Sequence, residues 1–228
     1  NPELFNRPFW QDVVFRSDQP EVNYTKSTVV DLNNDGFDEL VVATDQNELL
    51  VLAANAKLQW RKTFDAPVLS LICEDLDGDA LREVICATHD HAVYAFDWSG
   101  KQRFQIDILS EQARKSGANG LSVYRNAAGQ RELAVSTYHQ LRRYDRKGRL
   151  IEAIDPISGM YLDSMPVVAS DFTHDGIDDF VLRDNVHGHV TLVDGRTQKP
   201  VAASTTRQTG RGLAVLPWRM SHASGPGN

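Results

Sequence analysis

Carboxylate and amide side chains recur at fixed spacing in three segments of this chain. The segments run from Asp31 to Glu39, from Asp75 to Glu83 and from Asp171 to Asp179, with oxygen-bearing side chains at positions 1, 3, 5 and 9. A tight loop with this alternation directs those side chains to one centre, and position 7 adds a backbone carbonyl. Hard oxygen ligands in a flexible loop suit Ca²⁺ better than a transition metal. The sequence therefore predicts up to three structural Ca²⁺ sites, with these ligands: Asp31, Asn33, Asp35, Phe37 and Glu39; Asp75, Asp77, Asp79, Leu81 and Glu83; Asp171, Thr173, Asp175, Ile177 and Asp179.

The acidity of the chain has a local origin in these loops. The formal net charge is −7, and the three segments carry twelve of the 31 acidic residues. Three bound Ca²⁺ ions would leave a net charge of about −1. No Lys/Arg cluster follows the pattern of a phosphate-binding surface, so nucleic acid is not an expected partner. No apolar run is long enough to insert into a membrane.

A second set of polar side chains recurs in the turns that follow the strand after each acidic loop. Histidines at alternate positions of an extended segment share one face and could bind one metal ion. A metal site, a His/Tyr acid–base site and simple polar turns all remain open. This possible ligand face comprises His89, His91, Tyr138, His139, His187 and His189.

The elements that position these side chains repeat with the loops. Position 9 falls at Glu39, Glu83 and Asp179, and a weaker copy from Tyr124 to Glu132 fills the long gap. Each unit adds two apolar strand-like runs around the loop, a third partly alternating run, a turn and a more polar fourth run. Repeats of this length with four short strands each are typical of β-propeller blades. We therefore expect an all-β propeller of four-stranded antiparallel blades at about 27–64, 67–106, 119–154 and 164–203.

Strand-like segments also lie near both ends of the chain, at 8–18 and 211–218. They could pair to complete a fifth blade, which would remove exposed sheet edges, or belong to a larger propeller of which this chain is a fragment. The expected organisation is thus a single propeller, or part of one, over residues 1–228.

The loops resemble the FG-GAP/VCBS repeat of integrin-α-like propellers. The resemblance rests on Asp-x-Asn/Asp-x-Asp-Gly-x-x-Glu/Asp followed directly by an apolar strand, and it covers about residues 27 to 203. It implies Ca²⁺ in the loops and a propeller that mediates binding. The chain departs from the pattern at Ala80, which replaces the loop glycine, and at Thr173, which replaces an acidic ligand. The third loop has lost its first and fifth carboxylates.

These patterns favour a calcium-stabilised binding or scaffold module that is part of a larger secreted or surface protein. Its expected location is extracellular, periplasmic or at the cell surface, with a protein or carbohydrate ligand. The alternative is a domain of a carbohydrate-active enzyme, similar to a polysaccharide lyase, that uses the histidine-bearing face. No catalytic residue is predicted, because no nucleophile or acid–base constellation is recognisable.

Two residue types leave alternatives open. Cys73 and Cys86 flank the second loop, where they could be buried thiols in adjacent strands or a cross-strand disulfide. The tryptophans, among them Trp60 and Trp98, could stack on sugars or fill the wedge between blades.

Overall fold

The computed structural model describes residues 24–108, 118, 120–137, 140–154, 168–183 and 190–203. These residues form four antiparallel sheets of four strands each, and in every sheet the strands are paired in chain order. The first sheet contains β1 (Tyr24–Val30), β2 (Glu39–Thr44), β3 (Glu48–Leu52) and β4 (Leu58–Thr63). The second contains β5 (Val68–Glu74), β6 (Glu83–Thr88), β7 (Ala92–Phe96) and β8 (Gln102–Asp107). The third contains β9 (Gly120–Arg125), β10 (Arg131–Ser136), β11 (Leu141–Tyr144) and β12 (Leu150–Ile154). The fourth contains β13 (Val168–Ser170), β14 (Asp179–Arg183), β15 (Val190–Val193) and β16 (Pro200–Ala203).

Burial follows the order of the strands within each sheet. The second strand is the most buried, and all six residues of β6 are shielded from solvent. After Glu83, its sequence is a run of small and β-branched side chains, which suits a strand packed on both faces. The fourth strands are largely exposed and polar, as in β4 and β8. This gradient from apolar to polar strands is what the sequence pattern predicts.

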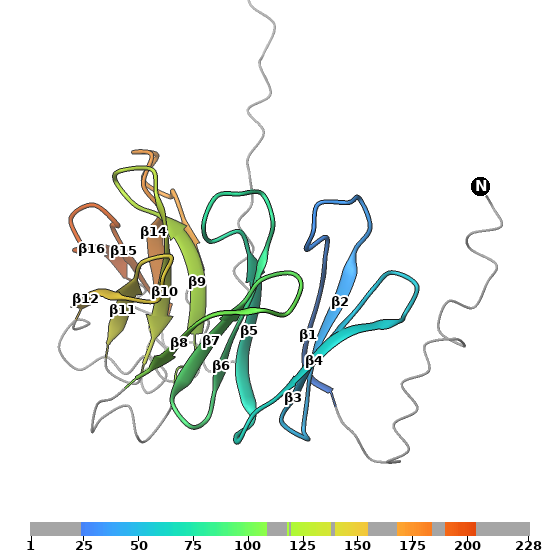
Figure 1. The fold of residues 1–228 in the computed structure, drawn as a ribbon. Helices are drawn as coiled ribbons and strands as arrows, with labels where there is room; N and C mark the ends of the chain where they lie inside the picture. Colours follow the sequence, from blue (N-terminus) through green and yellow to red (C-terminus); the bar gives the residue numbers. More distant parts are fainter. Residues whose placement is uncertain are drawn as a thin grey trace, which may run out of the picture.

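The hydrophobic core lies between neighbouring sheets. One cluster joins Val41 and Val51 of the first sheet to Val84 and Phe96 of the second. Two further clusters join the second sheet to the third and the third to the fourth. The first strands also contact one another in series, β1 with β5, β5 with β9 and β9 with β13. The sheets therefore follow one another in chain order, as Figure 1 shows.

An irregularity of register recurs at one place in all four sheets, where the third strand ends against the fourth. It lies between Val51 and Leu52, between Ala95 and Phe96, between Arg143 and Tyr144, and between Leu192 and Val193. A bulge adds twist to a strand pair and is a feature of the local design. The four sheets are thus copies of one unit, and the all-β propeller architecture predicted from the sequence is confirmed.

The strand order separates the connections into two edges. The loops between first and second strands lie at one end of the sheets, which is the upper end in Figure 1, and the turns between second and third strands lie at the other. The turns between third and fourth strands return to the first end. We call this end the loop-bearing edge.

Parts of the sequence interpretation lie outside the described residues. These are the terminal segments 8–18 and 211–218, so the proposed fifth blade stays a prediction. None of the described residues forms a helix that is long and apolar enough to cross a membrane.

Candidate functional site

The first acidic loop is shaped by its own side chains. The backbone N–H of Asp35 donates to Asp31 Oδ1 at 3.2 Å and to Asn33 Oδ1 at 3.0 Å. The N–H of Gly36 donates to Asp31 Oδ2 at 2.9 Å, and that of Phe37 to Asp35 Oδ1 at 2.9 Å. Short side chains that accept from the backbone two to five residues ahead wind the chain tightly. The alternation of polar residues therefore encodes the turn itself.

The same winding recurs in the second and fourth loops. Position 1 accepts backbone N–H groups at Gly78 and Ala80 in the second loop, and at Asp175 and Gly176 in the fourth. Positions 4 and 6 have positive φ in all three loops: Asn34 (59°) and Gly36 (88°), Gly78 (86°) and Ala80 (72°), His174 (59°) and Gly176 (87°). In the second loop the glycine has thus moved from position 6 to position 4. The departure at Ala80 leaves the backbone path of the loop unchanged.

The carboxylate at position 9 of each of these three loops accepts a hydrogen bond from the backbone N–H at position 2. Glu39 Oε2 accepts the N–H of Leu32 at 3.0 Å, and Glu83 Oε2 accepts that of Leu76 at 2.9 Å. Asp179 Oδ2 accepts the N–H of Phe172 at 2.9 Å. These three acids are 2%, 2% and 0% exposed. Burying an ionised carboxylate costs free energy unless it is paired and hydrogen-bonded, so the cations near each of these acids affect the stability of its loop.

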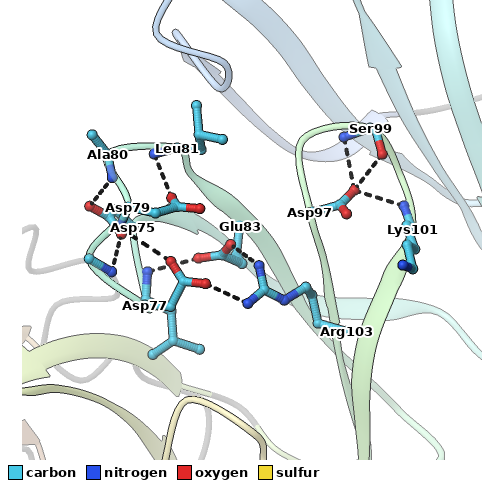
Figure 2. A network of polar contacts seen from close by, with 12 residues as sticks. Asp75, Asp77, Asp79, Ala80, Leu81, Glu83, Asp97, Ser99, Lys101 and Arg103 are labelled. Atoms are coloured by element: carbon cyan, nitrogen blue, oxygen red, sulfur yellow. Dashed lines mark hydrogen bonds and ion pairs between the residues drawn. The ribbon is translucent and has the colours of Figure 1, made fainter.

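The second loop brings three predicted ligands together. Oxygen atoms of Asp75, Asp77 and Glu83 all lie within 4.8 Å of one another. Arg103 of β8 reaches into this group, with Nη1 3.1 Å from Glu83 Oε1 and Nη2 in contact with Asp77 (Figure 2). Burial raises the pKa of Glu83 to about 7. The hydrogen bond from the backbone of Leu76 lowers this pKa, and the negative charge of Asp77 raises it further. The group therefore still favours additional positive charge.

A second arginine reaches the second loop from the neighbouring blade. Arg131 of β10 contacts the side chain of Asp75 and donates to its backbone carbonyl at 2.6 Å. Burial opposes ionisation there, but the hydrogen bond from Arg131 holds the pKa of Asp75 below its usual range.

The first loop lacks such an arginine. Gln59, which precedes Trp60 as Arg103 precedes Phe104, donates its amide to Glu39 Oε1 at 3.3 Å. Within the described part of the chain, no salt bridge reaches Asp31, Asp35 or Glu39. Among the three acidic loops, the first is therefore the one whose carboxylates have no arginine partner among the described residues.

The fourth loop has a surface arginine. Arg196 Nε lies 2.7 Å from Asp175 Oδ2, and this hydrogen bond lowers the pKa of Asp175. Unlike Arg103, Arg196 does not contact the position-9 carboxylate, because Asp179 bonds to backbone groups that include the N–H of Gly195 at 2.9 Å.

The third loop replaces the metal-binding pattern with an arginine. Glu132 lies 2.9 Å from Arg143 Nη2 and accepts the hydroxyl of Tyr124, and Arg143 also contacts Glu152 at 2.8 Å. Burial and the hydrogen bond to Glu132 raise the pKa of Tyr124. Arg143 lies over the Tyr124 ring, 5.6 Å from its centroid. The residue pattern does not predict this role of Arg143, because its partners Glu132 and Tyr124 are 11 and 19 residues away in the chain.

Neighbouring blades are joined by repeated backbone contacts at the loops. The N–H of Arg82, at position 8, donates to the carbonyl of Leu32 in the preceding blade at 2.8 Å. Asp178, also at position 8, donates in the same way to Arg125 at 3.0 Å. The loops therefore connect blades as well as carrying carboxylates.

Aromatic rings of the fourth strands form a second interblade contact. The ring of Trp60 packs on Gly100, where an added Cβ would lie 2.7 Å from two ring atoms, and Trp60 Nε1 donates to the carbonyl of Trp98 at 2.9 Å. Phe104 packs on Gly148 with the same closest approach. Of the two roles considered for Trp60, the structure supports filling the space between blades. The sequence contains a signal for this contact, because each glycine has an aromatic partner in the fourth strand of the preceding blade. Gly100 pairs with Trp60, and Gly148 pairs with Phe104.

The histidine-bearing turns are described only in part. Tyr138, His139, His187 and His189 lie outside the described residues. In the turn between β6 and β7, His89 is exposed and His91 has a φ of 69°. His91 Nδ1 is buried without a hydrogen-bond partner among the described groups, and neither histidine joins a group of three described potential metal ligands. A ligand site on this edge stays a prediction.

Cys73 and Cys86 are buried free thiols. They belong to the core between the first and second sheets. Burial raises the pKa of Cys73 to about 12 and also raises that of Cys86. Both thiols are therefore unreactive in the folded protein.

Comparison with known proteins identifies one family model. Residues 4–96 match the model described as KICSTOR complex protein kaptin. The matched stretch is less than half of the chain and reaches to the end of β7. The match is to kaptin and not to the FG-GAP/VCBS repeat that the loops resemble. No curated protein sequence matches the chain.

Solved structures resemble the fold at low sequence identity. Saccharomyces cerevisiae Sqt1 aligns with a TM-score of 0.63 and 13% identity, covering 79% of this chain and 49% of that one. BBS1N in complex with ARL6DN aligns with a TM-score of 0.59 and 16% identity, covering 82% and 55%. The V. cholerae biofilm matrix protein Bap1 gives 0.56 and 11%, covering 78% and 55%. The chain thus spans about half the length of the solved chains it matches.

The expected location is wrong. The acidic repeats predict a location outside the cell or at its surface, but the matching family is that of kaptin, a component of a cytosolic complex and not an extracellular protein. Acidic loops of this kind, taken alone, do not indicate a compartment.

Proposed function

We propose that this chain is part of a β-propeller that acts as a protein-interaction scaffold and binds its partner with the loop-bearing edge. The observation that carries this proposal is the position of the exposed apolar side chains. All eight large hydrophobic residues that are exposed among the described residues lie at this edge: Val29, Phe37, Leu58, Trp98, Leu150, Ile151, Phe172 and Val201.

The most exposed of these side chains sit on the acidic loops or beside them. Phe37 is 66% exposed at position 7 of the first loop, whereas Ile177, at the same position of the fourth loop, is 3% exposed. Val29, at the end of β1, is 64% exposed. Apolar side chains gathered on one edge of a rigid scaffold favour a protein partner. The match to a complex subunit over residues 4–96 supports the same class of function.

Calcium is the second part of the proposal. The loops would hold Ca²⁺ with carboxylate, amide and backbone oxygens, and the bound ion would stabilise the edge that contacts the partner. The donor set fits because Asp31, Asn33 and Asp35 are all oxygen-bearing and belong to one tight turn. The first loop is the candidate with no described arginine partner, whereas the second loop is the one whose three acidic side chains already lie within 4.8 Å of one another.

The scaffold proposal is tested by assembly. The chain would be co-expressed, in place of kaptin, with the other subunits of the KICSTOR complex, and its co-elution would be measured. We expect association that is lost in Phe37→Ser, since this exposed ring supports no described core cluster. His89→Ser, an exposed substitution on the opposite edge, is the matched control. Failure of the chain to associate, or equal association of both variants, contradicts the proposal.

A further inference from the structure

A cleft of about 550 Å³ opens between the second and third blades on the loop-bearing edge. Its walls are the second acidic loop, the turn between β9 and β10, and the turn between β11 and β12. It lies at the seam where Arg131 crosses to Asp75.

Cationic side chains dominate the accessible part of this cleft. Arg131, Arg146, Lys147 and Arg149 line it, and all four residues are exposed. The side chain of Arg149 is 76% exposed. In a chain with a net charge of −7, this concentration of cations is a local feature.

Each carboxylate in the cleft lining has an arginine partner. Asp77 contacts Arg103, which also pairs with Glu83, and Glu132 lies 2.9 Å from Arg143, which also pairs with Glu152; both arginines lie outside the lining. Asp145 lies 2.6 Å from Arg149.

Two cations in the cleft, Arg146 and Lys147, take part in no ion pair within the described part of the chain. Their charges are therefore available to a ligand.

The start of β12 adds an apolar side chain to the lining. Ile151 lines the cleft and is 47% exposed. A phosphate backbone would gain nothing from this side chain, whereas a peptide with acidic and apolar residues would use both features.

We infer that this cleft binds an acidic segment of a protein partner, with its carboxylates on Arg146 and Lys147 and an apolar side chain against Ile151. The inference rests on the proposed scaffold function and adds the chemistry of the partner. Charge complementarity of this kind steers encounter and weakens with salt.

The test measures fluorescence polarisation of a labelled eight-residue peptide of alternating Glu and Leu, with a Lys/Leu peptide and a single-stranded oligonucleotide as comparison probes. The test variant is Arg146→Glu/Lys147→Glu. The matched control is Lys57→Glu/Lys101→Glu, which makes the same change in charge. Lys57 and Lys101 occupy the equivalent turns of the first and second blades, which close with the same 2.9 Å backbone hydrogen bond as the turn at Arg149.

We expect the Glu/Leu peptide to bind, with affinity reduced about tenfold or more by the test variant and less than about twofold by the control. Equal effects of the two variants, no binding of the Glu/Leu peptide, or equally tight binding of either comparison probe would overturn the inference. Assembly with partner subunits is measured separately, so a peptide that fails while assembly persists overturns the cleft and leaves the scaffold proposal standing.

Discussion

Replacing Gly100 by alanine tests the aromatic contact between blades. The residue has a φ of +85°, and a Cβ built on it would lie 2.7 Å from Cγ and Cδ2 of Trp60. Carbon atoms in contact normally lie about 3.5 to 4.0 Å apart, so the ring or the turn would have to move.

The expected loss of free energy of unfolding in Gly100→Ala has two parts, and a second glycine of the chain allows them to be measured separately. The left-handed backbone costs a residue with a Cβ about 1–2 kcal/mol, and overpacking against the ring costs about 1–3 kcal/mol. Gly129 has a φ of +74° with nothing within 4 Å of its added Cβ, so Gly129→Ala carries the backbone cost alone. We expect Gly100→Ala to lower the free energy of unfolding by about 1–3 kcal/mol more than Gly129→Ala.

Urea denaturation followed by tryptophan fluorescence and by circular dichroism measures both values, and coincidence of the two probes establishes a two-state comparison. Gly148→Ala repeats the experiment at the next seam, where Phe104 supplies the ring at the same distance of 2.7 Å. If both substitutions cost the same as Gly129→Ala within about 0.5 kcal/mol, the rings do not pack on these glycines in solution.

Three further predictions concern the charges of the loops. Millimolar Ca²⁺ should raise the melting temperature relative to EDTA, by several degrees if Ca²⁺ reaches about 100 times its Kd. Asp35→Ala should reduce this rise and Asn126→Ala should not; identical curves in EDTA and Ca²⁺ would exclude the metal. Gln59→Arg should also reduce the Ca²⁺-dependent rise in melting temperature, because it supplies to the first loop the kind of cation that Arg103 supplies to the second. An unchanged rise would show that an arginine at position 59 does not replace the bound ion. Arg143→Met should lower the free energy of unfolding by about 3 kcal/mol, because it leaves Glu132 buried without a counter-charge. Adding Glu132→Gln to the same chain should recover part of this loss, measured by thermal or urea unfolding. No recovery would contradict that cause.

The loops could be predicted well because they depend on near neighbours. Their winding is made by hydrogen bonds from Asp31 and Asn33 to backbone groups two to five residues ahead. The spacing of the acidic residues therefore contains the geometry, and the strands on either side follow from unbroken runs such as Glu83–Thr88. The third loop shows the limit of the pattern. Tyr124 stands where the other loops have an aspartate, so the spacing indicates only a missing ligand, whereas its hydroxyl donates to Glu132 of the same blade.

The position of the exposed apolar side chains could not be predicted in the same way. The sequence indicates a possible ligand face at the histidine-bearing edge, whereas the exposed apolar side chains of the described residues gather at the opposite one. Whether Phe37 is exposed while Ile177 is buried at the equivalent position depends on what packs beside each loop. That is a property of neighbouring strands and not of the repeat.

The sequence by itself determined the repeat, the four-stranded blade and the course of each acidic loop, because these rest on periodicity and on hydrogen bonds within nine residues. Only the tertiary structure decided which of the loop carboxylates have an arginine partner. Arg103 meets Glu83 from 20 residues away, and Arg131 reaches Asp75 from 56 residues away in the next blade. Such pairs are set by strand register and by the packing of one blade on another. The loops share one pattern in the sequence, but their ion pairs differ because their neighbours differ.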